Sequence, residues 1–260
     1  AHAMRLGNIK YYRPSTMFWD KRAASLELQV SQPITHPIEM GFDSAHGGIN
    51  ALLTKLAAST YYPDLFTLAF GNAAITEARI QQALAQFARS MISSASRWDT
   101  AYAQVFNATA QNRNLNAPLP GFSASEELGH QLFMTGRGQG GAGCAACHQP
   151  PTFALAANSL SNGLDANETI IFKSPSLKNV GLSRAFMHDG RFSTLEQVIE
   201  HYNSGIQNGP ALDNRLKTPA GGPLRLNLTA NEKAALVAFL LTLNDGSLTT
   251  DAKFSDPFKK

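Results

Sequence analysis

The sequence predicts a mostly α-helical fold with long loops, and three observations support this prediction. Several segments repeat apolar residues at helical spacing, capping signals precede them, and no segment of any length alternates as a strand would. The chain has 260 residues, 43% hydrophobic and 16% charged, which is enough for one large domain or two of ordinary size. A polar, Pro- and Asn-rich segment at 107–122 predicts a linker, so we divide the chain into domains at 1–117 and 118–260.

The first clear helix is predicted within residues 76–94, "TEARIQQALAQFARSMISS". Thr76 can cap its start, and one stripe of it is apolar, carrying Ile80, Leu84, Phe87 and Met91. An apolar stripe of this kind normally faces a core, so we expect these side chains to be buried.

Three later helices are predicted by the capping box, in which Ser or Thr at the helix start is followed three residues later by Glu. The matching pairs are Ser123 with Glu126, Ser193 with Glu196, and Thr229 with Glu232. The last pair precedes the apolar segment "NEKAALVAFLLTLND", which predicts a terminal helix.

Residues 144–148, "CAACH", contain the only two cysteines of the chain and match the pattern of c-type haem attachment. On one helical turn, Cys144 and Cys147 can reach the two vinyl groups of a porphyrin, and His148 can bind the iron from the proximal side. A zinc site would need a second pair of ligands, a thioredoxin-like dithiol would need a βαβ setting, and a disulfide would not need the histidine. The motif therefore predicts one covalent haem c within a cytochrome c-like domain.

The helix that begins near Thr194 carries candidates for the other side of the iron. Its apolar stripe holds Leu195, Val198, Ile199 and Tyr202, whereas His201 projects away from this stripe. From the periodicity alone, Tyr202 is more simply read as a core tyrosine with its hydroxyl at a polar edge, and His201 as a surface histidine.

Charge and hydropathy exclude several function classes. The formal net charge is +3 without a basic block, which does not favour nucleic-acid binding, and no run of about 20 apolar residues predicts a membrane span. The first residues, "AHAMRLGN", lack the features of a signal peptide. We therefore expect this sequence to be a processed form or a piece of a longer chain.

Four stretches together resemble one known family. The segment "FKSPSLKNVGLSRAFMHDGRFSTLEQVI" resembles the signature of the C-terminal haem domain of the bacterial dihaem cytochrome c peroxidase/MauG family. Upstream, "FWDKRAASLELQVSQPITHPIEMG" resembles the stretch between the two haems of that family, and "YPDLFTLAFG" and "ALAQFARSMISSASRWD" match as well. The resemblance covers nearly the whole chain in order.

The resemblance implies roles for individual residues. Cys144, Cys147 and His148 match the attachment site and proximal ligand of the second haem. Trp19 matches the tryptophan that carries electrons or holes between the haems, and Glu39 matches the acid/base glutamate of the peroxidatic pocket at the first haem.

The distal side of the second haem is assigned in the same way. His188 matches the histidine beside this haem, and Lys178 in the same signature is taken as a cofactor-binding residue. Fourteen residues after His188, typical peroxidases place a methionine ligand, whereas this chain and MauG-type members have tyrosine. The resemblance therefore implies that Tyr202 is the distal ligand of the haem iron.

Two features depart from the family pattern. The attachment motif of the first haem has no counterpart, so residues 1–117 look like the remainder of a peroxidatic domain without its CxxCH. The family's interdomain calcium would use backbone carbonyls at Ser183 and Ala185. Its side-chain ligand position falls at His2, and histidine is a poor ligand for this hard cation.

The resemblance implies a periplasmic haem c oxidoreductase that uses hydrogen peroxide and passes electrons between haems through a tryptophan. Its partners would be a small donor cytochrome or cupredoxin, or a protein substrate, with a second haem in the full-length protein. A homodimer, or association with the missing N-terminal part, is also raised. The alternatives are a mono-haem electron-transfer cytochrome, with Met187 or Tyr202 as sixth ligand, and a structural or sensory haem module.

Overall fold

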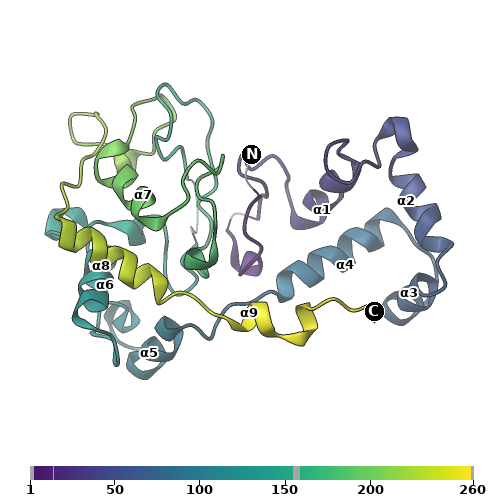
Figure 1. The fold of residues 1–260 in the computed structure, drawn as a ribbon, viewed down its shortest axis with the longest axis horizontal. Coiled ribbons are helices and arrows are strands. Elements are labelled where there is room, and N and C mark those ends of the chain that lie inside the picture. Colours follow the sequence, from purple (N-terminus) through teal and green to yellow (C-terminus); the bar gives the residue numbers. More distant parts are fainter. Residues whose placement is uncertain (1–2, 14, 155–158, 259–260) are drawn as a thin grey trace. The chain divides into compact units, whose positions relative to one another are not determined.

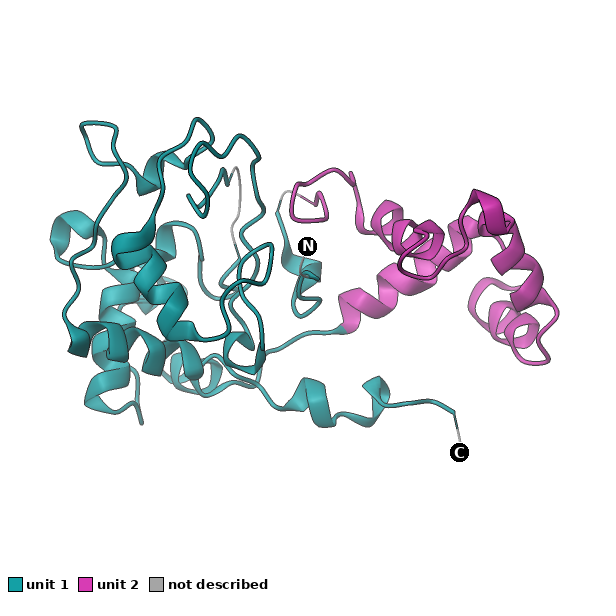
Figure 2. Ribbon diagram, turned by 45° about the horizontal axis from the view of Figure 1, so that its top comes forward, with its two compact units in different colours: residues 1–14, 91–260 teal, residues 15–90 magenta. Residues whose placement is uncertain are grey.

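The computed structural model describes residues 3–13, 15–154 and 159–258. The chain forms two compact units, unit 1 from residues 1–14 and 91–260 and unit 2 from residues 15–90 (Figure 2). Helices joined by long loops dominate both units, and within the described ranges β-structure is limited to isolated bridges (Figure 1). The predicted fold class is therefore confirmed. No helix in the described residues is long and apolar enough to cross a membrane.

Unit 1 contains the helices that follow residue 91. They are α5 (Arg97–Val105), α6 (Ala124–Met134), α7 (Leu195–Glu200), α8 (Ala230–Leu241) and the short α9 (Ser247–Thr250). The capping boxes predicted at Ser123 and Thr229 are both present at the starts of α6 and α8. These caps satisfy backbone N–H groups that the first helical turn leaves without partners.

The start of α7 differs from the prediction by one residue. The Thr194 hydroxyl accepts the Gln197 N–H at 3.3 Å, so the capping box is Thr194–Gln197 and not Ser193–Glu196. The Gln197 side-chain oxygen accepts the backbone N–H groups of both Ser193 and Thr194. A glutamine amide can therefore perform the role that the sequence pattern assigned to a glutamate.

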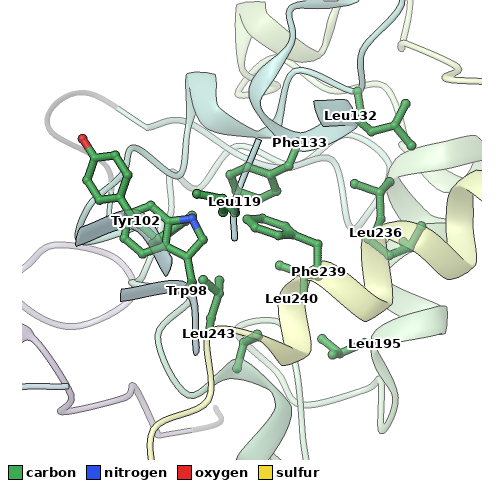
Figure 3. Close-up of a cluster of buried hydrophobic side chains, with 14 of the residues drawn as sticks. Trp98, Tyr102, Leu119, Leu132, Phe133, Leu195, Leu236, Phe239, Leu240 and Leu243 are labelled. Atoms are coloured by element: carbon green, nitrogen blue, oxygen red, sulfur yellow. The ribbon is translucent and has the colours of Figure 1, made fainter. Parts of the chain in front are cut away.

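The core of unit 1 is built where α6 and α8 pack together. Gly129 of α6 permits this close approach, because a Cβ at this position would lie 1.9 Å from the Ala235 carbonyl oxygen of α8. Figure 3 shows the large buried side chains of this core converging from α5, α6 and α8; they include Trp98, Phe133, Leu236 and Phe239. Cys144 and Ala145 pack against the same cluster, so the core directly supports the CAACH motif.

Residues near the N-terminus belong to unit 1 through hydrogen bonds to later segments. The Asn8 N–H donates to the Met91 carbonyl at 2.8 Å, and the Asn8 side chain accepts the Ser93 N–H at 2.9 Å. The Tyr12 hydroxyl accepts the Ser176 N–H at 3.3 Å.

The units divide the chain after residues 14 and 90. The compositional boundary at 117/118 instead lies inside unit 1, because Trp98 and Tyr102 of α5 share one core with α6 and α8. The assignment of 1–117 and 118–260 to two haem domains stays a prediction.

Unit 2 is a small helical unit. It contains α1 (Leu26–Thr35), α2 (Gly48–Ala57), α3 (Tyr62–Phe70) and α4 (Glu77–Ser90). Its buried cluster draws Ile34, Leu52, Phe66 and Ile80 from these four helices.

One expectation for α4 is wrong. Thr76 caps the helix and Ile80 is buried as predicted, but Leu84 is 40% and Phe87 47% exposed. Helix α1 packs on the neighbouring stripe of α4 instead, where Gln81 donates to Ser31 and Arg89 pairs with Glu27. The side chains buried behind these contacts are Ala85 and Ala88, whose small size lets the helices approach.

Candidate haem site

The CAACH motif forms a single tight turn. Gly143 has a left-handed backbone (φ +72°) and leads into the 3₁₀ turn Cys144–Ala146. The N–H groups of Cys147 and His148 donate to the Cys144 carbonyl at 3.1 and 2.9 Å. Both cysteines are free thiols, so the structure gives the two sulfurs and the imidazole one shared turn, as the motif predicted.

The surroundings of the two thiols keep them protonated. Burial raises the pKa of Cys144 to about 12 and also raises the pKa of Cys147. The positive charge of Arg137 acts in the opposite direction on both, and Arg215 does so on Cys147. Arg215 is itself fixed, because it pairs with Asp213 at 2.7 Å and donates to the Ala146 carbonyl at 3.1 Å.

His148 has the properties of an iron ligand. Burial lowers its pKa to about 4, so the imidazole is neutral at physiological pH and a ring nitrogen has a free lone pair. Backbone hydrogen bonds to Phe153 and Pro175 partly oppose this shift, and they orient the ring. The Ser174 hydroxyl lies 3.3 Å from Nδ1 of the same ring.

Tyr202 belongs to the same site. Burial raises the pKa of its phenol to about 12, and the charges of Cys147 and Cys144 contribute to this shift, which places the hydroxyl within electrostatic reach of both thiols. The Asn162 side-chain amide donates to the Tyr202 hydroxyl at 3.5 Å and to the Met187 sulfur at 3.3 Å. A buried ring with its hydroxyl on a polar amide also fits the core tyrosine that the periodicity indicated, so the role of Tyr202 as the distal ligand stays a prediction.

The expectation that His201 is a surface residue is wrong. The side chain is 5% exposed, and Nε2 lies 3.1 Å from the Asn162 carbonyl oxygen. The physical reason is a contact from outside the helix: the segment at Asn162 covers this ring, and the Phe192 ring centre lies 6.0 Å from that of His201. A π-helical turn, His201–Gly205, follows α7 directly, but the His201 N–H still donates to the Gln197 carbonyl as in an α-helix.

Lys178 lies deep in unit 1, with an exposed fraction of 3%. Its ammonium pairs with Asp99 at 2.5 Å and donates to the Ser96 hydroxyl at 3.2 Å. It also stands 4.9 Å from the centre of the Trp98 ring. These contacts give Lys178 a structural function, and its assignment as a cofactor-binding residue stays a prediction.

His188 packs its ring flat on Phe172, with ring centres 3.9 Å apart. Sequence reasoning missed its other neighbours, Asp165 and Glu168, whose ligand atoms lie with that of His188 in a group spanning less than 4.8 Å. Arg191 already neutralises Asp165 through two hydrogen bonds of 2.8 and 2.9 Å. The 20-residue gap before His188 offers no motif from which this group could have been found.

The predicted calcium ligands are only partly described. The Ser183 hydroxyl donates to the Ala185 carbonyl at 3.3 Å, so this carbonyl already accepts one hydrogen bond. His2 lies outside the described residues.

The residues expected to act at the first haem lie in unit 2. Trp19 stands in a tight loop closed by the Met17–Ala23 bridge, in which Phe18 and Lys21 have left-handed backbones. Glu39 lies in the turn after α1, where its side chain is 55% exposed and lies 4.0 Å from the His36 ring. Trp19 and Glu39 belong to a different unit from the CAACH motif, so their roles in haem chemistry stay predictions.

The donor set fits a c-type haem. Two free thiols, a neutral imidazole and a phenol converge in unit 1, and Arg5, Arg137 and Arg215 act electrostatically on this group.

Comparison with known proteins shows which family the chain matches. Residues 1–105 and 123–240 match the family described as di-haem cytochrome c peroxidase. The chain is 30% identical over 251 residues to the methylamine utilization protein MauG of Methylophilus methylotrophus, covering 92% of this chain and 67% of that protein. It is 32% identical over 240 residues to MauG of Methylorubrum extorquens and 28% identical over 246 residues to cytochrome c551 peroxidase of Nitrosomonas europaea. These two matches cover 86% and 87% of this chain but only 60% of either relative, so the chain spans about three fifths of their length.

Solved structures show the same relationship. A MauG-like protein associated with microbial copper homeostasis superposes with a TM-score of 0.75 at 29% identity, covering 99% of this chain and 79% of that one. The diheme peroxidase BthA from Burkholderia thailandensis shares the fold, with a TM-score of 0.60 at 19% identity over 94% of this chain and 70% of its own. The matched family and the convergence of the CAACH motif with Tyr202 lead to one conclusion: the chain belongs to the di-haem cytochrome c peroxidase family.

Proposed function

We propose that this chain is part of a periplasmic haem c oxidoreductase of the cytochrome c peroxidase/MauG type that uses hydrogen peroxide. The observation that supports this proposal best is the shared site of Cys144, Cys147, His148 and Tyr202 in unit 1. The family is di-haem, and residues 1–260 contain one attachment motif, so the second haem would be supplied from outside these residues.

The residues divide the chemistry between them. Haem c, when bound, supplies an iron centre that exchanges single electrons. Cys144 and Cys147 would hold the porphyrin covalently, and His148 would bind the iron through its neutral imidazole. Tyr202 would complete the distal side as a phenolate, an anionic ligand that stabilises oxidised iron and lowers its reduction potential.

Unit 2 would contribute the peroxidatic residues. Glu39 would hold and return a proton beside the bound peroxide, and Trp19 would pass electrons between the haems. The high exposure of Glu39 is consistent with a carboxylate that faces a segment outside residues 1–260. The donor would be a small cytochrome or cupredoxin, or a protein substrate as in MauG-like oxidation. A calcium ion at Ser183 and Ala185 stays a prediction.

Spectroscopy of the haem-loaded chain tests the site. We expect an intact mass with one covalent haem, lost when Cys144 and Cys147 are both replaced by alanine, and resonance Raman bands of an iron–phenolate bond that vanish in Tyr202→Phe. Tyr102→Phe is the matched control, because it removes a hydroxyl that donates only to the Arg113 carbonyl, at 2.9 Å. Absence of phenolate bands, with a near-infrared band of methionine–iron ligation instead, would refute Tyr202 and favour a simple electron carrier.

Kinetics test the acid/base. In a form of the protein that includes the first haem, Glu39→Gln should reduce peroxide turnover about 100-fold or more, as loss of a positioned acid/base does. Asp64→Asn, which neutralises an exposed carboxylate in the same unit, should leave turnover unchanged. Equal turnover of wild type and Glu39→Gln would reduce Glu39 to a structural role.

A further inference from the structure

One side-chain amide contacts two groups that can bind iron. Asn162 Nδ2 lies 3.3 Å from the Met187 sulfur and 3.5 Å from the Tyr202 hydroxyl. The Met187 sulfur and the Tyr202 hydroxyl therefore lie close to each other, on either side of one amide nitrogen. Only Tyr202 is used by the proposed function, which leaves the thioether of Met187 without an assigned role.

The backbone around Asn162 is held in place from several directions. Its carbonyl lies 3.1 Å from Nε2 of the buried His201, the residue before Tyr202. On one side, the Ser161 N–H donates to the Ala211 carbonyl at 2.8 Å. On the other side, Gly163 has φ +68°, and a Cβ there would lie 2.7 Å from the Gln207 carbonyl oxygen. The amide thus projects from a fixed support that also orients Tyr202.

Met187 is held by an unusual backbone. Its φ is +69°, a left-handed conformation that residues with a Cβ adopt rarely and that clusters at functional sites. The next residue, His188, stacks flat on Phe172. The left-handed turn therefore sends two consecutive side chains to different partners, His188 to Phe172 and Met187 to the Asn162 amide.

We propose that Met187 is a second distal ligand, which replaces Tyr202 when the iron is reduced, and that Asn162 positions both groups for this exchange. The proposal rests on Tyr202 being the ligand of the oxidised iron. A phenolate is a hard, anionic ligand that suits ferric iron, whereas a thioether is soft and neutral and suits ferrous iron. The iron would then have a low reduction potential in its oxidised state, and the Met187 thioether would stabilise it after reduction.

The exchange balances in atoms and electrons. A one-electron donor reduces Fe(III) to Fe(II), the bond between iron and the Tyr202 oxygen breaks, and the phenolate takes one proton from solvent. The Met187 sulfur then gives its lone pair to the iron, and oxidation reverses each step. A phenol has an ordinary pKa of about 10, so Tyr202, once released from the iron, is protonated at neutral pH. Because reduction takes up a proton, the midpoint potential should fall as pH rises.

Carbon monoxide binding to the dithionite-reduced, haem-loaded chain tests Met187. In the wild type the thioether must leave first, so Met187→Leu should bind carbon monoxide at least about 10-fold faster, while its ferric Raman spectrum keeps the phenolate bands. Met134→Leu, the same change at a partly buried position of α6, should match the wild type in both measurements. Unchanged carbon monoxide binding in Met187→Leu would overturn the proposal.

Two measurements keep the proposal testable without that variant. Reduced wild type that is rapidly reoxidised should show a transient near-infrared band of methionine–iron ligation, decaying as the phenolate bands return. Asn162→Leu, which keeps the shape and removes the donor, should retain part of that band in the ferric state and raise the potential.

The outcomes separate this proposal from the proposed function. Ferric wild type without phenolate bands refutes Tyr202 as a ligand and the exchange with it. Phenolate bands combined with a pH-independent potential, or with no methionine signal after reoxidation, refute only the exchange.

Discussion

The close approach of α6 and α8 at Gly129 allows one prediction to be worked out in detail. In Gly129→Ala, the new Cβ would lie 1.9 Å from the Ala235 carbonyl oxygen and 2.8 Å from the Phe239 Cβ. Restoring an ordinary contact of about 3.5 Å requires the two backbones to separate by roughly 1.5 Å. Because the obstacle is backbone, no rotamer change relieves it, and we expect a cost of about 3 kcal/mol, at the upper end for overpacking.

Helix propensity opposes this cost, since alanine is favoured over glycine by about 1 kcal/mol within a helix. The net loss in the free energy of unfolding is therefore about 2 kcal/mol. With a denaturant dependence of about 2–3 kcal/mol per molar urea, the midpoint should fall by roughly 0.8 M. The assay is urea unfolding of the haem-loaded chain, followed by Soret absorbance to report on unit 1.

The matched control is Gly136→Ala, because Gly136 has an ordinary backbone (φ −65°) and a Cβ there meets no heavy atom within 4 Å. Its free energy of unfolding should stay within about 0.5 kcal/mol of that of the wild type. If Gly129→Ala were as stable as Gly136→Ala, the helices would not be in the tight contact described here.

Three further predictions follow from buried or capping groups. Lys178→Met should lower the free energy of unfolding in urea by about 3–5 kcal/mol, because it leaves Asp99 without its buried partner. Lys253→Met, at the exposed pair with Asp251, should lower it by less than about 1 kcal/mol. Equal losses in the two variants would contradict the argument. Burial lowers the pKa of His130, His148 and His201. Below about pH 6.5 these histidines therefore bind protons in the unfolded chain but not in the folded chain. Stability should therefore be full above about pH 6.5 and fall steadily towards pH 4, with a shallower fall in His130→Gln; a flat profile of Tm against pH would refute this. Thr229→Ala should cost about 1 kcal/mol in the same unfolding assay by removing the cap of α8, and no measurable loss would show that this cap is dispensable.

Much of the fold was predictable because its signals are local. A capping serine or threonine with a glutamate three residues later predicted the starts of α6 and α8, whereas the same pattern at Ser193 missed the cap of α7 by one residue. The CAACH motif is local in the same sense, since one turn contains both thiols and the imidazole. These features depend on neighbours in the sequence and not on the rest of the fold.

The features that sequence reasoning missed depend on partners far along the chain. Leu84 and Phe87 are exposed because α1 packs beside Ala85 instead, a choice that no periodicity within α4 reveals. His201 is buried because the segment at Asn162, 39 residues away, covers its ring, and Lys178 pairs with Asp99, 79 residues away. The Asn162 amide contacts Met187 and Tyr202, which lie 25 and 40 residues away in the sequence, so no sequence motif reveals these contacts.

The hydrogen bonds from Asn8 to Met91 and Ser93 have a consequence for how the protein is made. They join the chain just before residue 15 to the chain just after residue 90, so residues 15–90 form an insertion whose two ends are fastened together. During synthesis, Asn8 cannot form its bonds to Met91 and Ser93 until those residues have emerged, and Tyr12 must wait for Ser176. Unit 2 can therefore complete its folding while the segment that contains Asn8 and Tyr12 is still undocked. The slow step of folding would be the late docking of that segment onto the rest of unit 1, because contacts between residues far apart in the sequence have a large entropic cost.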